Sequence, residues 1–286
     1  MVTIESDIKM VYNDIKATER KRKKQKIMFF LPFELQPDGR GRKAKSRGFT
    51  LIEILVVIAI VGLLSSIVLV ALNYTRENAR MKASLSFAAQ INRVAGDQAV
   101  GNWPLNEGSG TVADDGSGSK NNGTVLNGAV WSTDTPAEAG YSLYLDGVND
   151  YIQVTDTAEL KYKGGDLTLA VWIKPAATET TNGYVISKAW NNLGQYNYQL
   201  LYYTDGRINF HLLGATAYSL TTSIRIPKDK WTFVAATVDS FKNVTIYIDG
   251  KIRATGVHNI TSWTPTAVAD SNRPLAIGTL YPYGSG

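Results

Sequence analysis

One carboxylate at the head of a long apolar run constrains this chain more than any other feature. The segment Ser46-Arg47-Gly48-Phe49-Thr50-Leu51-Ile52-Glu53 leads into 19 residues, Ile54 to Leu72, without a charged side chain. As a helix this stretch is about 28 Å long, which is enough to cross most of the hydrocarbon core of a bilayer. A carboxylate in such a segment costs about 2–3.5 kcal/mol at full depth, so we expect Glu53 to have a partner.

This segment resembles the N-terminus of type IV pilins and of the pseudopilins of type II secretion. The match covers Lys45 to Leu64 and rests on Gly-Phe-Thr-Leu-Ile-Glu followed by an apolar helix. In that family a prepilin peptidase cuts after the Gly, the new N-terminal Phe is methylated, and the Glu pairs with the N-terminal amine of a neighbouring subunit. The resemblance therefore implies processing between Gly48 and Phe49 and an assembly role for Glu53. An ordinary signal anchor whose flank contains a Glu is the alternative.

The basic surplus of the chain lies before this motif. Residues 1–48 hold 13 Lys and Arg against 6 Asp and Glu, which leaves 17 and 19 for the rest, so the net charge of +5 divides into +7 and −2. Positive charge before an apolar segment holds that end in the cytoplasm, and we expect the part that follows to be exported. The slightly acidic mature part excludes a nucleic-acid partner. The run Arg20-Lys21-Arg22-Lys23-Lys24 fits a solvated flank of a removed leader, with a nucleic-acid or nuclear-import patch as the alternative.

The helix should continue beyond the apolar run. No Pro or Gly occurs between Asn73 and Ala95, and apolar residues recur there at three- and four-residue spacing, namely Met81, Leu85, Ala88, Ile91 and Ala95. We expect one helix over 49–96, with residues 49–72 in the membrane and the second half against a globular domain. Gly96 is a candidate C-cap.

After a linker at 97–102, short β-rich runs alternate with Gly, Asn and Asp turns. Asp205-Gly206 and Asp249-Gly250 predict tight hairpin turns. Trp231–Val238 is apolar or small on both faces, as expected of a central strand covered by two sheets. Nine strands in one domain predict a jelly roll of two sheets over 103–286. The predicted strands are Ser142–Leu145, Tyr151–Val154, Leu167–Lys174, Tyr184–Lys188, Tyr198–Tyr203, Arg207–Leu213, Trp231–Val238, Val244–Ile248 and Lys251–Thr255.

The strand sequences resemble laminin-G-like, concanavalin A-like domains from about Asn102 to Gly278. The motifs stand in family order and include Trp103-Pro104-Leu105-Asn106-Glu107-Gly108, Leu145-Asp146-Gly147-Val148-Asn149-Asp150, Ala170-Val171-Trp172-Ile173-Lys174-Pro175 and Tyr247-Ile248-Asp249-Gly250-Lys251. Domains of this family usually end with one more strand, which does not follow Gly278 here. We therefore expect an unpaired sheet edge, through a truncated gene or partial record, or one filled by a neighbouring subunit.

The concanavalin A-like fold hosts glycoside hydrolases as well as lectins, so the fold does not decide the activity. A retaining hydrolase needs two carboxyl groups about 5–5.5 Å apart, which on one strand means acidic residues at i and i+2 or i+4. The four glutamates of the domain are not so spaced: Glu107, Glu138, Glu159 and Glu179. We expect no enzyme. The chain contains no Cys, so the exported domain must rely on its core.

Two sets of residues are candidates for binding. Carboxylate and amide oxygens in turns suit calcium, which takes about six to eight oxygen ligands. The calcium candidates are Asp115, Asn121, Asn122, Asp146, Asn149 and Asp150, and simple turn formation is the alternative. Sugars bind aromatic side chains beside polar groups, and Trp190, Asn191 and Asn192, which we expect in a loop, are the ligand candidates.

Taken together, the two resemblances imply a prepilin-like subunit of a type IV pilus. It would enter the bacterial inner membrane, be cut after Gly48, assemble with other pilin subunits through its helix, and display a lectin-like adhesive domain toward glycan or surface protein. A pseudopilin of a type II secretion system and a membrane-anchored carbohydrate-binding protein that does not assemble remain open.

Overall fold

The computed structural model describes residues 49–286 apart from 179, 192–194, 214–215, 262–272 and 280–286. The chain divides into two units, residues 1–59 and 60–286. Helix α2 runs from Leu51 to Ala95, so the predicted helix is confirmed and begins two residues after Phe49. Among the described residues, this is the one helix whose length and apolar composition would allow it to cross a membrane. Gly96, at a φ of +43°, starts the 3-10 turn η1 (Gly96–Gln98) in the left-handed conformation that favours Gly after a helix.

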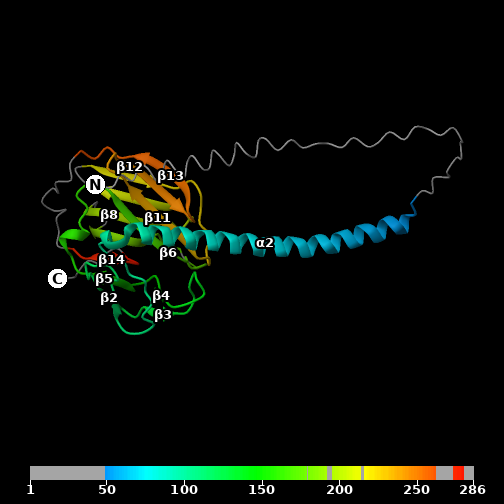
Figure 1. Ribbon diagram of the computed structural model, residues 1–286, viewed down its shortest axis with the longest axis horizontal. Coiled ribbons are helices and arrows are strands. Elements are labelled where there is room, and N and C mark those ends of the chain that lie inside the picture. The colour runs from blue at the N-terminus through cyan, green and yellow to red at the C-terminus, as the bar shows by residue number, and fades with distance from the viewer. Residues whose placement is uncertain (1–48, 179, 192–194, 214–215, 262–272, 280–286) are drawn as a thin grey trace. The chain divides into compact units, whose positions relative to one another are not determined.

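The larger sheet of the β domain contains, in the described residues, eight strands in the order β1-β2-β5-β14-β7-β8-β9-β10. Figure 1 labels β2, β5, β14 and β8 of this sheet. All neighbouring strands are antiparallel. The strands are β1 (Val112–Ala113), β2 (Gly123–Leu126), β5 (Tyr151–Val154), β14 (Leu275–Ile277), β7 (Gly183–Asn191), β8 (Gln195–Tyr202), β9 (Ile208–Leu213) and β10 (Ala217–Thr221).

The smaller sheet has the order β13-β12-β11-β6 among the described residues. Its strands are β13 (Lys251–Val257), β12 (Asn243–Ile248), β11 (Thr232–Val238) and β6 (Leu167–Ile173), and a separate hairpin is formed by β3 (Val130–Ser132) and β4 (Ser142–Tyr144). A 3-10 turn, η2, covers Ala158–Leu160. Asp249 and Gly250 join β12 to β13 with φ of +51° and +72°, as the predicted Asp-Gly hairpin turn requires.

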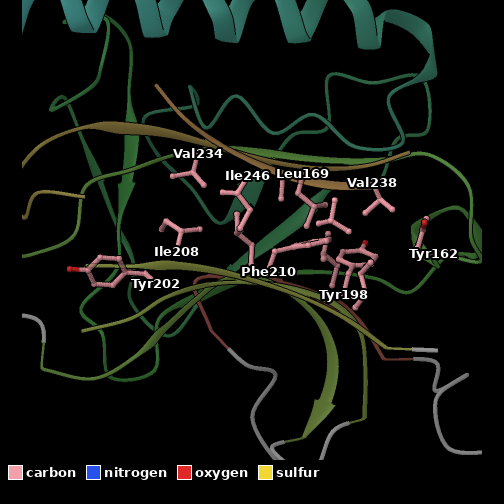
Figure 2. Close-up of a cluster of buried hydrophobic side chains, with 14 of the residues drawn as sticks. Tyr162, Leu169, Tyr198, Tyr202, Ile208, Phe210, Val234, Val238 and Ile246 are labelled. Atoms are coloured by element: carbon pink, nitrogen blue, oxygen red, sulfur yellow. The ribbon is translucent and has the colours of Figure 1, made fainter. Parts of the chain in front are cut away.

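Alternate residues of the two sheets fill one core between them. Figure 2 shows Ile208 and Phe210 of the larger sheet pointing toward Val234 and Ile246 of the smaller one, and all four are fully buried. Leu167, Leu169, Val171 and Ile173 of β6 lie on the face that meets this core, whereas Trp172 lies on the opposite face. The predicted alternation of that strand is confirmed, because its inward set packs against this core.

The other face of the smaller sheet is covered by the second half of α2. Ala88 is buried against Phe233 and Ala235 of β11, and Phe87 makes an edge-on ring contact with Phe233 at a centroid distance of 5.9 Å. The expectation that two sheets cover the strand at 231–238 is therefore wrong. One of its faces meets the core and the other meets the helix, whose three- and four-residue spacing supplies an apolar surface of its own.

Candidate functional site

The carboxylate of Glu53 lies in the first turn of α2 and binds the residue that precedes the helix. Thr50 donates to Glu53 Oε2 from its backbone N at 2.7 Å and from its Oγ1 at 2.8 Å. The backbone N of Glu53 donates in return to Thr50 Oγ1 at 3.3 Å. This reciprocal pair is a capping box, which satisfies donors at the start of a helix that otherwise lack partners.

The pilin resemblance assigned no role to Thr50. Its capping role could have been predicted from the sequence, because Thr-x-x-Glu before an apolar run is the spacing of a capping box. Phe49 is 82% exposed, and Gly48, on the other side of the predicted cut, lies outside the described residues. The large apolar side chains from Leu51 to Leu72 are exposed as well, which is a surface that soluble domains rarely leave uncovered.

The first group of calcium candidates lies in the connection between β1 and β2. Asp115 Oδ1 accepts from the backbone N of Asn102 and of Ser117, both at 2.8 Å. Its Oδ2 accepts from Ser117 Oγ and from the backbone N of Asn121, both at 2.7 Å. Desolvation raises the pKa of the Asp115 carboxyl, but these hydrogen bonds outweigh it, and the pKa lies below its ordinary value. Both oxygens are occupied by protein donors, so Asp115 is a poor ligand for a cation.

The side chains of Asn121 and Asn122, in the same connection, form hydrogen bonds that hold this loop together. Asn121 is 7% exposed and donates from Nδ2 to Val100 O at 2.7 Å. Asn122 accepts from the backbone N of Asp115 at 2.9 Å and donates to Asp114 Oδ1 at 3.0 Å. The turn-forming alternative accounts for these contacts without a metal.

The second group of calcium candidates lies between β4 and β5, and it contains a carboxylate oxygen without a hydrogen-bond partner. Asp146 Oδ1 accepts from the backbone N of Val148 at 2.8 Å and of Asn149 at 3.3 Å, and the first of these is the main reason that the pKa of Asp146 is lowered. Asp150 is 5% exposed, and its Oδ2 accepts from the backbone N of Asp146 at 3.0 Å. Its Oδ1 is buried without a hydrogen-bond partner.

Asp150 is therefore a calcium candidate with a buried carboxylate oxygen that no protein donor fills. No group of three or more His, Cys, Asp or Glu side chains gathers in the described residues, so a cation there would need backbone carbonyls and water as well. The Asp115 group lies in the connection between β1 and β2 and this group lies in the connection between β4 and β5, so the candidates form two separate turns.

The sugar candidates lie at the end of a strand. Trp190 and Asn191 belong to β7, and Asn191 is paired with Gln195 of β8. The expectation that both lie in a loop is therefore wrong, because β7 and β8 extend their pairing to the hairpin end. Asn192 lies outside the described residues.

Two family models match the chain. The prokaryotic N-terminal methylation motif matches residues 43–69, and the concanavalin A-like lectin/glucanases superfamily matches residues 146–285. The chain thus joins a pilin-type methylation motif to a lectin-like β domain, as the two resemblances implied. No curated protein matches the chain.

Solved structures similar to the chain include two binding domains of toxins or related proteins and one domain of an arabinanase. The binding domain of Paraclostridial mosquitocidal protein 1 is 18% identical over 57% of this chain and 41% of its own, with a TM-score of 0.46. Domain 4 of an extracellular arabinanase from Geobacillus stearothermophilus, solved with arabinotriose, is 20% identical over 59% and 79%, with a TM-score of 0.45. The binding domain of botulinum neurotoxin serotype G is 14% identical over 58% and 43%, with a TM-score of 0.42.

Proposed function

We propose that the chain is a pilin-type subunit of a type IV pilus that displays its β domain outside the cell as an adhesive, glycan-binding module. After cleavage by a prepilin peptidase, the helix leaves the inner membrane and packs with the helices of other subunits. The β domain, carried at the other end of the helix, then faces the surroundings.

The observation that carries this proposal is the carboxylate of Glu53 in the first turn of an apolar helix. From Ile54 to Leu72 the helix has no charged side chain, so Glu53 has no cation on its own helix within that stretch. Phe49 lies four residues before it, and cleavage after Gly48 would create an amine at Phe49. In a filament, that amine on a neighbouring helix is a cation that can pair with Glu53 in an apolar environment, where an unpaired charge is costly.

The proposal includes a binding role without catalysis for the β domain. Glu107 and Glu138 lie outside the strands, and Glu159 lies in the 3-10 turn η2. Among the described glutamates none is therefore placed on a strand, where a retaining pair would stand on one face. Glu179 lies outside the described residues.

The test is intact-mass and N-terminal analysis of the protein produced with and without a prepilin peptidase. A product that begins at methylated Phe49 only when the peptidase is present supports pilin-type processing. An uncut chain under both conditions overturns the proposal and leaves a membrane-anchored binding protein.

A second measurement separates processing from assembly. Glu53→Ala should be cut normally and yet fail to enter filaments, whereas Ser65→Ala, a small change farther along the same helix, should be incorporated as the unchanged protein is. Filaments are sheared from cells and their subunits quantified by immunoblot. Normal incorporation of Glu53→Ala would remove the assembly role. Incorporation only into a secretion-system filament, without a surface pilus, would favour the pseudopilin alternative.

A further inference from the structure

A row of polar side chains crosses the outer face of the larger sheet. Strand pairing aligns seven residues from β2 to β10, namely Thr124, Gln153, Ala276, Ser187, Gln199, His211 and Ser219. The neighbouring row points to the opposite face and is entirely apolar, with Val125, Ile152, Ile277, Ile186, Leu200, Phe210 and Leu220. The polar row contains amides, hydroxyls, one imidazole and the methyl group of Ala276, and it contains no Lys, Arg, Asp or Glu. Its middle members Ala276, Ser187 and Gln199 are buried, whereas Ser219 at its β10 end is exposed.

At the β9–β10 end of this row a buried amide has an unused acceptor. Asn209 is fully buried, and its Nδ2 donates to Ser219 Oγ at 2.9 Å and to Thr221 Oγ1 at 2.6 Å. Its Oδ1 is buried without a hydrogen-bond partner. A buried polar atom left unpaired is destabilising, and such atoms in a folded protein call for an explanation. Ser219 is exposed and Thr221 is half-buried, so the hydroxyls that Asn209 holds can be reached from solvent.

Aromatic side chains lie on the same face. Tyr184 of β7 is paired with Leu201 of β8, and Leu201 is paired with Asn209, so all three point outward. Tyr203, one residue beyond the inward-facing Tyr202, is half-buried, and the Arg207 guanidinium lies 5.7 Å from its ring centroid. Ring faces beside amides and hydroxyls are the two kinds of surface that a sugar uses, since it has apolar C–H faces and hydroxyl groups at its edges.

We propose that this outer face, centred on Asn209, Ser219 and Thr221, binds a neutral oligosaccharide. The inference rests on the proposed function and gives its binding role a location and a ligand class. A sugar hydroxyl both donates and accepts, so it can exchange hydrogen bonds with the hydroxyls of Ser219 and Thr221, which the buried Asn209 amide holds in place. The Arg207 guanidinium beside Tyr203 is paired with Asp205 at 2.6 Å, and the polar row itself contains no cation, so neutral chains are favoured.

The experiment uses the processed full chain in detergent micelles. Binding of the protein is measured on immobilised neutral oligosaccharides of glucose, galactose, mannose, xylose and arabinose, and on sialylated and sulfated chains for comparison. The double variant Ser219→Ala/Thr221→Val removes two hydroxyls from the face. The matched control, Thr255→Val, removes one exposed hydroxyl from β13 of the other sheet. Thermal unfolding of each variant reports whether the fold is kept.

We expect a neutral oligosaccharide to bind, the double variant to weaken that binding about tenfold or more, and the control to leave it unchanged. Binding that the double variant does not weaken overturns the location and leaves the proposed function in place. Binding confined to sialylated or sulfated chains overturns the ligand class. A chain that is cut and assembled normally but binds none of these glycans overturns the inference while pilin-type assembly stands. If the double variant fails to fold, Ser219→Ala alone, at an exposed position, must weaken binding for the proposal to stand.

Discussion

Thr50 determines what Glu53 contacts before assembly, because it donates two hydrogen bonds to the carboxylate and receives one. Thr50→Val keeps the shape and removes the hydroxyl. Losing such a cap costs about 0.5–2 kcal/mol of helix stability, so we expect incorporation into filaments to fall by up to about tenfold. Thr50→Ser retains the hydroxyl and should behave like the unchanged chain. Equal amounts of the Val and Ser variants in sheared filaments would show that the capping box has no part in assembly.

Asp150 carries a buried carboxylate oxygen without a hydrogen-bond partner, which is destabilising. A bound calcium ion would pair with this oxygen and remove that loss of stability. Calcium at about 100 times its Kd should stabilise the domain by about 2.7 kcal/mol, which raises Tm by roughly 5 °C or more. In chelator, Asp150→Asn should be at least as stable as the unchanged domain, and it should lose the response to calcium.

Asp115→Asn is the matched control for this prediction, because Asp115 already accepts four hydrogen bonds. It should lower Tm to the same extent with calcium and with chelator, both measured by thermal unfolding. A calcium-induced rise in Tm of the same size in Asp150→Asn would place any bound ion elsewhere.

Both histidines should make the domain sensitive to mild acid. Burial lowers the pKa of His211 and of His258 from 6.5, and in His258 the charge of Lys242 lowers it further while Asp239 opposes. Below about pH 6.5 the unfolded chain binds these protons and the folded chain resists them. The two histidines therefore do not reduce the free energy of unfolding above that pH, and they reduce it increasingly as the pH drops from about 6.5 toward 5. His211→Gln/His258→Gln should flatten this part of a plot of Tm against pH, and an unchanged slope would assign the loss to carboxylates.

Helix α2 is fixed to the smaller sheet by an arginine as well as by apolar contacts. Arg80 Nη1 donates to Asp249 Oδ2 at 2.6 Å, and its Nη2 donates to Glu77 Oε1 at 2.6 Å and to Trp231 O at 3.0 Å. Asp249 Oδ1 in turn accepts from the backbone N of Phe233 at 3.1 Å. One guanidinium thus joins the helix to β11 and to the turn between β12 and β13.

Arg80→Ala should lower the free energy of unfolding by about 1–3 kcal/mol, because it leaves the Asp249 carboxylate, 13% exposed, without its cation. Arg80→Lys should restore only part of this, since an ammonium lacks the planar fork that reaches several acceptors. Arg76→Ala, an exposed change one turn earlier, serves as the control and should be nearly neutral. Denaturant unfolding measures all three, and equal losses for Arg80→Ala and Arg76→Ala would contradict the prediction.

The elements that the sequence predicted well are those whose signal is local. The helix follows from its apolar spacing, and β6 and β12 follow from alternation that their inward faces confirm. Strands β1, β2, β3, β10 and β14 are absent from the predicted set, because they are short or mix Ala, Ser and Thr, and their partners hold them in place. Glu53 could be found because it is isolated among apolar residues. The polar row could not, because its members become neighbours only through strand pairings such as Gln153 with Ala276.

For the molecule as a whole, the second half of α2 belongs to the folding unit of the β domain. Phe87, Ala88 and Ile91 cover Phe233 and Ala235, and burial of such side chains contributes about 25 cal/mol for each Å² removed from water. A chain beginning at Tyr74 should therefore be soluble and unfold in one transition. A chain beginning at Asn102 should unfold at a Tm lower by roughly 10 °C or more, and it should bind a hydrophobic dye.

Phe87→Ser in the longer chain tests the same contact without removing the helix and should give an intermediate Tm. Equal Tm values for the two chains would mean that the sheet face needs no cover and that α2 is only a stalk. If the shorter chain is the weaker one, the helix that assembles with other subunits is also the helix that stabilises the displayed domain. A mechanical force applied to the domain would then be transmitted to the filament through the contacts of Phe87, Ala88 and Arg80.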